Sequence, residues 1–140
     1  MTSIKNVNYE TKSRLNKLLA SENASLVIHP SLVEVEKGGD IRGFAFSVEN
    51  KRNKISTYSY EVMPKNLSSC GGEINKKAVD SWILGKEGEF SISSKERLEP
   101  PLMVKFNVPE NAPPCPIMLR LQIYEDGEPF ESSQILLTIQ

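Results

Sequence analysis

The chain has 140 residues, of which 39% are hydrophobic and 25% charged, and its formal net charge is −1. This length fits one domain, and the hydrophobic fraction allows a proper core. The 17 Lys and Arg residues are scattered and form no basic stripe with interleaved aromatics, which argues against nucleic-acid binding. No run reaches the about 18 apolar residues of a membrane span, and no signal peptide opens the chain.

Residues 1–25 differ from the rest of the chain and are expected to be helical or partly disordered. The stretch from Thr11 to Ala20 consists largely of good helix formers, and Leu15, Leu18 and Leu19 make a short apolar stripe. A helix of this length is marginal alone. It can serve as a juxtamembrane stalk or a partner-binding helix, but packing on the following domain, or fraying, is the preferred interpretation.

From residue 26 onward the pattern is that of β-strands, which predicts one domain over 26–140. Leu26 and Ile28 lie in a first short strand that Pro30 stops, and Val33 and Val35 share one face of the next strand. A strand interrupted by proline is typical of a sheet edge, so these four apolar residues mark the candidate edge strand. Further alternating strands are predicted at 41–50, 55–63, 88–94, 102–108, 117–124 and 131–140.

The stretch 102–124 is the clearest part of the pattern, because two alternating strands flank the proline-rich segment 109–116. Proline cannot pair within a central strand, so this segment predicts a crossover between two sheets, as in a Greek key. The Asp126-Gly127 step predicts a tight hairpin turn. Residues 64–80 form the least regular region. The resulting fold class is all-β, an immunoglobulin-like Greek-key sandwich of seven to eight strands.

Cys70 and Cys115 are the only cysteines, and neither has a CxxC spacing or histidine companions. A zinc site is therefore not expected. The residues leave two alternatives open, a disulfide or two free loop thiols. A disulfide between them would stabilise the fold by roughly 4 kcal/mol in the chain-entropy model.

The run from His29 to Lys54, HPSLVEVEKGGDIRGFAFSVENKRNK, resembles the opening of the NEW3 and CARDB-type domains of archaeal and bacterial surface proteins. These immunoglobulin-like modules begin with a Pro … Val-x-Val-x-x-Gly strand. The segment 106–114 is similar to the part of these modules that precedes the penultimate strand. Cys115 stands where glycine is common, and this departure favours a disulfide. The resemblance covers about residues 26–140 and implies architecture more than function.

Residue patterns for catalysis or metal binding are weak. His29 is the only histidine and lies beside a proline at the expected edge. A calcium site that combines Asp40 with Glu125, Asp126 and Glu128 is conceivable if their loops converge, but solvated surface carboxylates are the preferred interpretation. We therefore expect no enzyme, no cofactor and no metal.

These observations favour a non-catalytic binding or assembly module of a cell-surface, secreted or appendage-associated protein. The expected partner is a protein, or a second copy of the chain, that binds along an edge strand. One alternative is an accessory carbohydrate-binding module of a larger hydrolase, with Trp82, Tyr124 and Phe130 as ligand-facing aromatics. Another is a cytoplasmic adaptor domain. The preferred location is extracytoplasmic, including the soluble part of a membrane-anchored protein.

Overall fold

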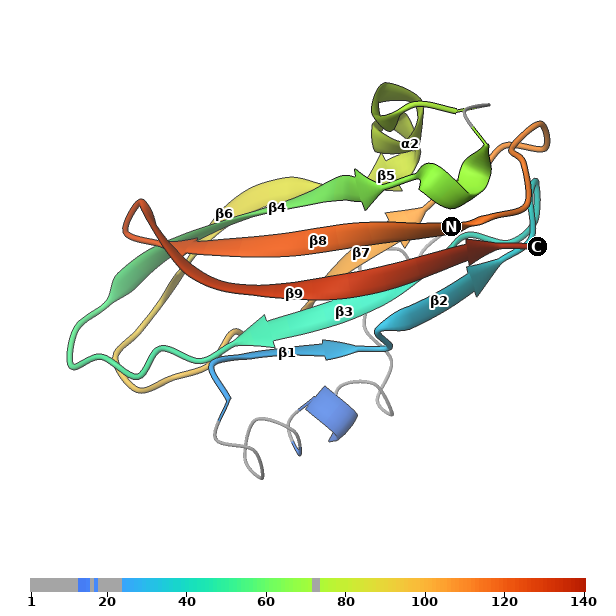
Figure 1. The fold of residues 1–140 in the computed structure, drawn as a ribbon. Coiled ribbons are helices and arrows are strands. Elements are labelled where there is room, and N and C mark those ends of the chain that lie inside the picture. The colour runs from blue at the N-terminus through green and yellow to red at the C-terminus, as the bar shows by residue number, and fades with distance from the viewer. Residues whose placement is uncertain (1–12, 16, 18–23, 72–73) are drawn as a thin grey trace.

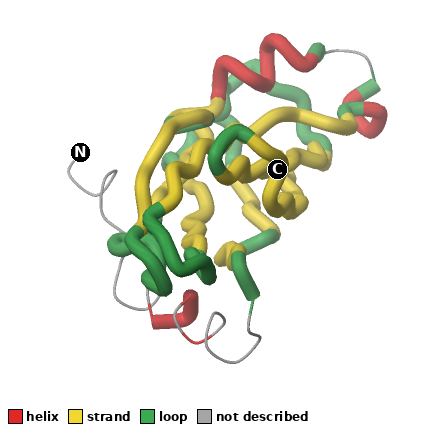
Figure 2. The backbone as a smooth tube through the Cα atoms, turned by 90° about the vertical axis from the view of Figure 1, so that its left-hand side faces the viewer, coloured by secondary structure: helices red, strands yellow, loops and turns green. Residues whose placement is uncertain are grey.

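The computed structural model describes residues 13–15, 17, 24–71 and 74–140. Within these residues the chain forms two β-sheets that pack face to face, with short helical segments outside them (Figures 1 and 2). The elements are β1 Leu26–His29, β2 Leu32–Val35, β3 Arg42–Val48, β4 Ser56–Asn66, η2 Ser68–Cys70, α2 Lys76–Trp82, β5 Ile83–Leu84, β6 Glu87–Ile92, β7 Leu102–Phe106, β8 Pro116–Glu125 and β9 Glu128–Ile139. The predicted all-β sandwich is confirmed, but the described residues form nine strands and not seven to eight, because the segment 26–35 supplies two strands and β5 adds a two-residue strand.

The strand order confirms two expectations from the sequence, the crossover between sheets and the Asp-Gly hairpin. One sheet has four strands in the order β1-β3-β7-β5, and the other has five in the order β2-β9-β8-β4-β6. Strands β7 and β8 therefore lie in different sheets, on either side of the proline-rich crossover. Strands β8 and β9 form a hairpin whose turn residues, Asp126 and Gly127, have φ values of 49° and 85°. Both values are positive, as the Asp-Gly step predicts.

A single segment near the start of the domain supplies an edge strand to each sheet. Strand β1 pairs antiparallel with β3, whereas β2 pairs in parallel with β9. Pro30 lies between them and has no N–H with which to continue a ladder. The chain therefore leaves the four-stranded sheet at this proline and joins the five-stranded one (Figure 1). On the opposite side of the sandwich, β5 and β6 are the corresponding end strands.

The core lies between the two sheets and follows the period of two in the sequence. In β8, four inward side chains have no exposure, and the residues that alternate with them are half-buried: the inward residues are Ile117, Leu119, Leu121 and Ile123. Tyr58 and Tyr60 of β4 also point inward. The Tyr60 ring meets Phe46 of β3 edge-on, with ring centroids 5.0 Å apart. Burial of each Ile, Leu, Val or Phe side chain in this core stabilises the fold by about 1.5–3 kcal/mol.

The segment 64–84 is more regular than the sequence indicates. The expectation of irregular chain from 64 to 80 is wrong, because β4 continues to Asn66 and α2 follows within the same region. The Asn75 carboxamide caps α2 and accepts a hydrogen bond from the Ala78 amide at 2.9 Å. The helix has seven residues and buries only Val79 and Trp82, so its apolar stripe is too short to recognise.

The described part of the N-terminal segment packs on the outer face of the four-stranded sheet. Residues 13–15 and 17 are helical, and Leu15 is completely buried against Val27 and Ala45, with Met103 alongside. The rest of the predicted stripe, Leu18 and Leu19, lies outside the described residues. The proposed boundary at residue 25 stays a prediction.

Candidate binding edges and their surroundings

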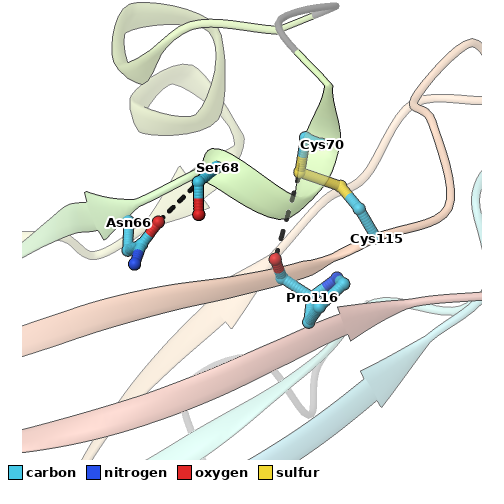
Figure 3. The surroundings of a disulfide bond; sticks show 5 residues. All are labelled: Asn66, Ser68, Cys70, Cys115 and Pro116. Carbon is cyan, nitrogen blue, oxygen red and sulfur yellow. Dashed lines mark hydrogen bonds between the residues drawn. A yellow bond between two sulfur atoms is a disulfide. The ribbon is translucent and has the colours of Figure 1, made fainter.

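The two cysteines are joined by a disulfide bond (Figure 3). The sulfur atoms are 2.02 Å apart and the Cα atoms 5.2 Å apart. Cys70 ends η2, which follows β4, and Cys115 directly precedes β8, so the bond connects the ends of two neighbouring strands. Nearby, the Asn66 carboxamide oxygen accepts a hydrogen bond from the Ser68 amide at 2.9 Å. The Cys70 sulfur lies 4.0 Å from the Pro116 carbonyl oxygen.

The predicted edge residues Leu26 and Ile28 lie on β1, at the end of the four-stranded sheet. The Glu49 amide donates to the Ser25 carbonyl at 2.9 Å, which sets the phase of the ladder with β3. Every second residue from Ser25 therefore bonds to β3, and the backbone groups of Leu26 and Ile28 point away from the sheet. Their side chains are half-buried and pack against the core.

The other two predicted edge residues, Val33 and Val35, lie on β2 but face inward, with exposures of 3% and 2%. The Gln140 amide donates to the Val35 carbonyl at 2.9 Å, so the alternate residues Val33 and Val35 bond to β9. The outward backbone groups of β2 belong to Leu32 and Glu34. The Leu32 side chain is 50% exposed on the outer face. On this side the free edge is therefore divided between two sheets.

Strand β6 forms the opposite end of the five-stranded sheet. The Val62 amide donates to the Lys86 carbonyl at 2.7 Å, and Gly88 lies opposite Tyr60 two positions further along. This phase directs alternate backbone groups toward β4 and the others away from it. The β6 residues whose N–H and C=O groups point away from β4 are Glu87, Glu89 and Ser91. In the described part of the chain, no backbone group pairs with them.

The side chains beside this edge form an acidic groove on the outer face of the five-stranded sheet. The groove has a volume of about 410 Å³, and its polar lining is Ser59, Glu61, Glu87, Glu89 and Tyr124. Glu61 lies directly opposite Glu87, and this cross-strand pair of like charges is unfavourable. The Tyr124 hydroxyl donates to the Glu61 carboxylate at 2.9 Å, which raises the Tyr124 pKa. Glu87 and Glu89 share one face of β6 because they are two positions apart, whereas Glu61 joins them only through the register of β4 with β6.

The three candidate ligand-facing aromatics occupy different environments. Trp82 is 8% exposed and packs in the main core, so its ring offers no open platform. Phe130 is half-buried and meets the Tyr58 ring edge-on, with centroids 5.7 Å apart. Tyr124 alone of the three lines the groove beside β6. The structure therefore does not bring the three rings together.

A charged network closes the β8–β9 turn. The Arg52 guanidinium lies 2.9 Å from the Glu125 carboxylate and 2.6 Å from that of Asp126. The Tyr58 hydroxyl donates to Glu125 at 2.6 Å. Burial, which is the larger cause, and this hydrogen bond both raise the Tyr58 pKa. The Thr57 amide donates to Asp126 and, with Arg52, lowers the Asp126 pKa. These contacts are intramolecular and engage both carboxylates.

The loops that hold the candidate calcium ligands do not converge. Asp40 belongs to the β2–β3 loop, which follows the end of β2, where Val35 pairs with Ile139 beside the start of β8. Glu125 is at the other end of β8. Within the described ranges, no group of three or more His, Cys, Asp or Glu side chains is placed to hold a metal. His29 lies on β1 opposite Ala45.

No family model and no curated protein sequence matches the chain. Among solved structures, the fold is similar to WR4, a C. elegans MSP family member, with a TM-score of 0.51, 13% identity and coverage of 84% of this chain and 99% of that one. It is also similar to part of a family 123 glycoside hydrolase from Clostridium perfringens, with a TM-score of 0.56 and 9% identity, over 77% of this chain and 22% of that one.

A PapD-like domain of human CEP192 matches with a TM-score of 0.49 and 11% identity, over 83% of this chain and 84% of that one. At identities this low, the matches to WR4 and to the glycoside hydrolase segment show likeness of fold alone and assign no family. The resemblance to NEW3 and CARDB-type domains is not shown. The molecule is an immunoglobulin-like β-sandwich with one disulfide and two differently built strand edges.

Proposed function

We propose that the chain is a non-catalytic binding or assembly module that engages a protein partner along a strand edge. The observation that carries this proposal is the pair of edges with outward backbone groups, β1 with β2 on one side and β6 on the other. An unpaired edge is a template to which an extended segment can add as a further strand. A partner strand bonded in this way extends the sandwich without disturbing its core.

The proposed location is extracytoplasmic, on the cell surface, in a secreted protein or in the soluble part of a membrane-anchored one. The Cys70–Cys115 disulfide supports this location, because such bonds persist mainly in oxidising compartments. No helix in the described ranges is long and apolar enough to cross a membrane. Kinship with the NEW3 and CARDB-type surface modules is part of the same proposal.

The compartment is tested by intact mass of protein recovered from its native source, alkylated before and after reduction. We expect alkylation only after reduction, because both thiols are bonded. Alkylation of both thiols without reductant would support the alternative, a cytoplasmic adaptor domain.

The binding role is tested by photo-crosslinking in the native source. A photoreactive amino acid is placed at Leu32 on the β2 edge and, separately, at Ser91 on the β6 edge. Ile55, which is 64% exposed outside the strands, is the matched control. We expect a discrete heavier adduct from at least one edge position and none from Ile55. No adduct from either edge overturns the proposal.

The second candidate is an accessory carbohydrate-binding module, which only the position of Tyr124 favours. Its ring lines a groove on an open sheet face, as a sugar-stacking residue does. Binding of a glycan that is lost in Tyr124→Ala and kept in Tyr124→Phe would support this function. The burial of Trp82 weakens it.

A further inference from the structure

Strand β6 has the longest run of outward backbone groups among the described edges. On β6 the backbone groups of three alternate residues from Glu87 to Ser91 point away from β4. On β1 and β2 only two residues each have outward backbone groups, and these strands belong to separate sheets. Added strands gain affinity from consecutive main-chain hydrogen bonds in register. The β6 edge is therefore the better template for strand addition.

The side chains of this edge determine which strand can add. Glu87 and Glu89 project from the outer face and are exposed, and Glu61 stands behind them on β4. No ion pair engages these three carboxylates in the described part of the chain. The nearest cation along the strand, Lys86, is paired with Asp80 at 2.5 Å. Lys86 also interacts through its charge with Glu87, but it is a single cation shared with Asp80, so the edge keeps a net negative charge.

A second copy of the chain does not suit this edge. Pairing two β6 strands edge to edge brings the Glu87 and Glu89 side chains of both copies onto the same sheet, and like charges in neighbouring strands repel. A strand with cations on that face removes the repulsion and also offsets the Glu61–Glu87 conflict. The charge pattern thus disfavours self-association and favours a basic partner.

We propose that the β6 edge binds an extended protein segment with Lys or Arg at alternate positions. This inference rests on the proposed binding function and names its edge and partner. The cations lie opposite Glu87 and Glu89, and a long cationic side chain reaches into the groove toward Glu61 and Tyr124. The alternate residues of the segment face inward beside Phe90, which is half-buried at the rim of the core, so small apolar residues fit there.

The first test uses three peptides and the folded, oxidised chain. The probe is acetyl-Thr-Lys-Val-Lys-Val-Lys-Thr-amide, and the first control has the same composition with the three lysines adjacent. The second control carries N-methyl groups on the amides that would bond to β6. We expect the alternating peptide to bind at least about ten-fold more tightly than either control. Equal binding of all three peptides overturns strand addition, because charge alone would then explain the affinity.

The second test reverses the charges. We expect the double variant Glu87→Lys with Glu89→Lys to lose binding of the lysine peptide and to gain binding of its glutamate counterpart. The matched control is Glu34→Lys with Glu36→Lys, which makes the same change at the β2 edge and should leave binding unchanged. Amide spectra establish that both variants are folded.

The outcomes separate this inference from the proposed function. If edge positions cross-link to a partner in the native source but the alternating peptide does not bind, the β6 assignment fails and the binding function stands. If neither edge cross-links, the binding function fails. Lysine-peptide binding that survives the β6 charge reversal also overturns the β6 assignment.

Discussion

The two sides of the sandwich limit strand pairing in different ways. On the β1–β2 side, Pro30 moves the chain from one sheet to the other, so neither sheet presents a long edge. On the β6 side the edge is continuous, and Glu87 and Glu89 discourage pairing with copies of the chain. Interruption and charge are both established means of protecting an edge. Interruption excludes most partners, whereas charge excludes only partners of the same sign.

The outer side chains strengthen this contrast. On β2, the Glu34 carboxylate accepts a hydrogen bond from the Gln140 side chain at 2.5 Å, so it is engaged within the fold. On β6 the exposed carboxylates have no such partner among the described residues, and one of them faces Glu61. The β6 side therefore carries an unfavourable pair of like charges, whereas the β2 carboxylate is held by a hydrogen bond.

The largest expected effect concerns the scaffold that both edges share. Replacing both Cys70 and Cys115 by alanine should lower the free energy of unfolding by roughly 4 kcal/mol, because the unfolded chain loses its constraint. Urea unfolding of the oxidised chain and the double variant measures this difference. Reductant should destabilise the natural chain and leave the variant unchanged. Binding of the lysine peptide to the folded variant should persist, since β6 keeps its pairing with β4.

A matched pair of glycine substitutions compares an interior strand with the open one. In Gly43→Ala the new Cβ would lie 1.9 Å from the Val104 carbonyl oxygen, so backbone must move, and we expect a loss of about 3 kcal/mol. In Gly88→Ala the nearest atom is on the Tyr60 ring at 3.0 Å, a looser contact with a side chain and not with backbone, so the loss should be smaller, about 1 kcal/mol. Chemical unfolding measures both. Equal losses would contradict the expectation that the backbone contact at Gly43 is more costly than the side-chain contact at Gly88.

A smaller effect tests the charge conflict beside β6. Glu61→Gln keeps the acceptor for Tyr124 and removes the repulsion with Glu87, so stability should rise by about 0.5 kcal/mol at low salt. High salt should abolish the gain, because it screens exposed charges. The matched change at the other edge, Glu34→Gln, should bring no gain. Stabilisation by both variants would show that the two edges do not differ.

The pH dependence of stability tests the carboxylate of Asp126, which is engaged at the β8–β9 turn. The Asp126 pKa is lowered chiefly by the Thr57 amide and by Arg52, so this group stabilises the fold above its unfolded pKa of about 3.8. That stability is lost as pH falls from that value through the folded pKa. Asp126→Asn keeps a residue suited to the turn and should flatten the acid limb of the stability curve. Thermal unfolding from pH 6 to pH 2.5 measures the change.

Local pattern predicted the fold well where one rule decided the outcome. Alternation identified β8, proline placed the crossover, and the Asp-Gly step placed the hairpin. The predicted end of β4 at residue 63 was too early, because proline at position 64 usually ends a strand. In β4 its missing N–H faces the side where β6 has already ended, so no ladder hydrogen bond is lost.

The candidate binding edge was harder to predict because it depends on pairing between distant residues. The sequence marked the proline-broken β1–β2 segment as an edge, which a local rule can do. Whether β6 is also an end strand depends on the strand order. The conflict between Glu61 and Glu87 depends on the register of β4 with β6. Neither feature can be read from a local pattern. The Glu87-Gly88-Glu89 spacing indicates only that two carboxylates share one face of a strand.

The most direct test of the β6 edge is amide hydrogen exchange of the free chain, resolved by residue. The amides of Gly88, Phe90 and Ile92 should be protected by β4, and those of Glu87, Glu89 and Ser91 should exchange rapidly. Adding the alternating lysine peptide should then protect the second group. If the amides of the second group are already protected in the free chain, another part of the molecule occupies the edge, and the account is contradicted.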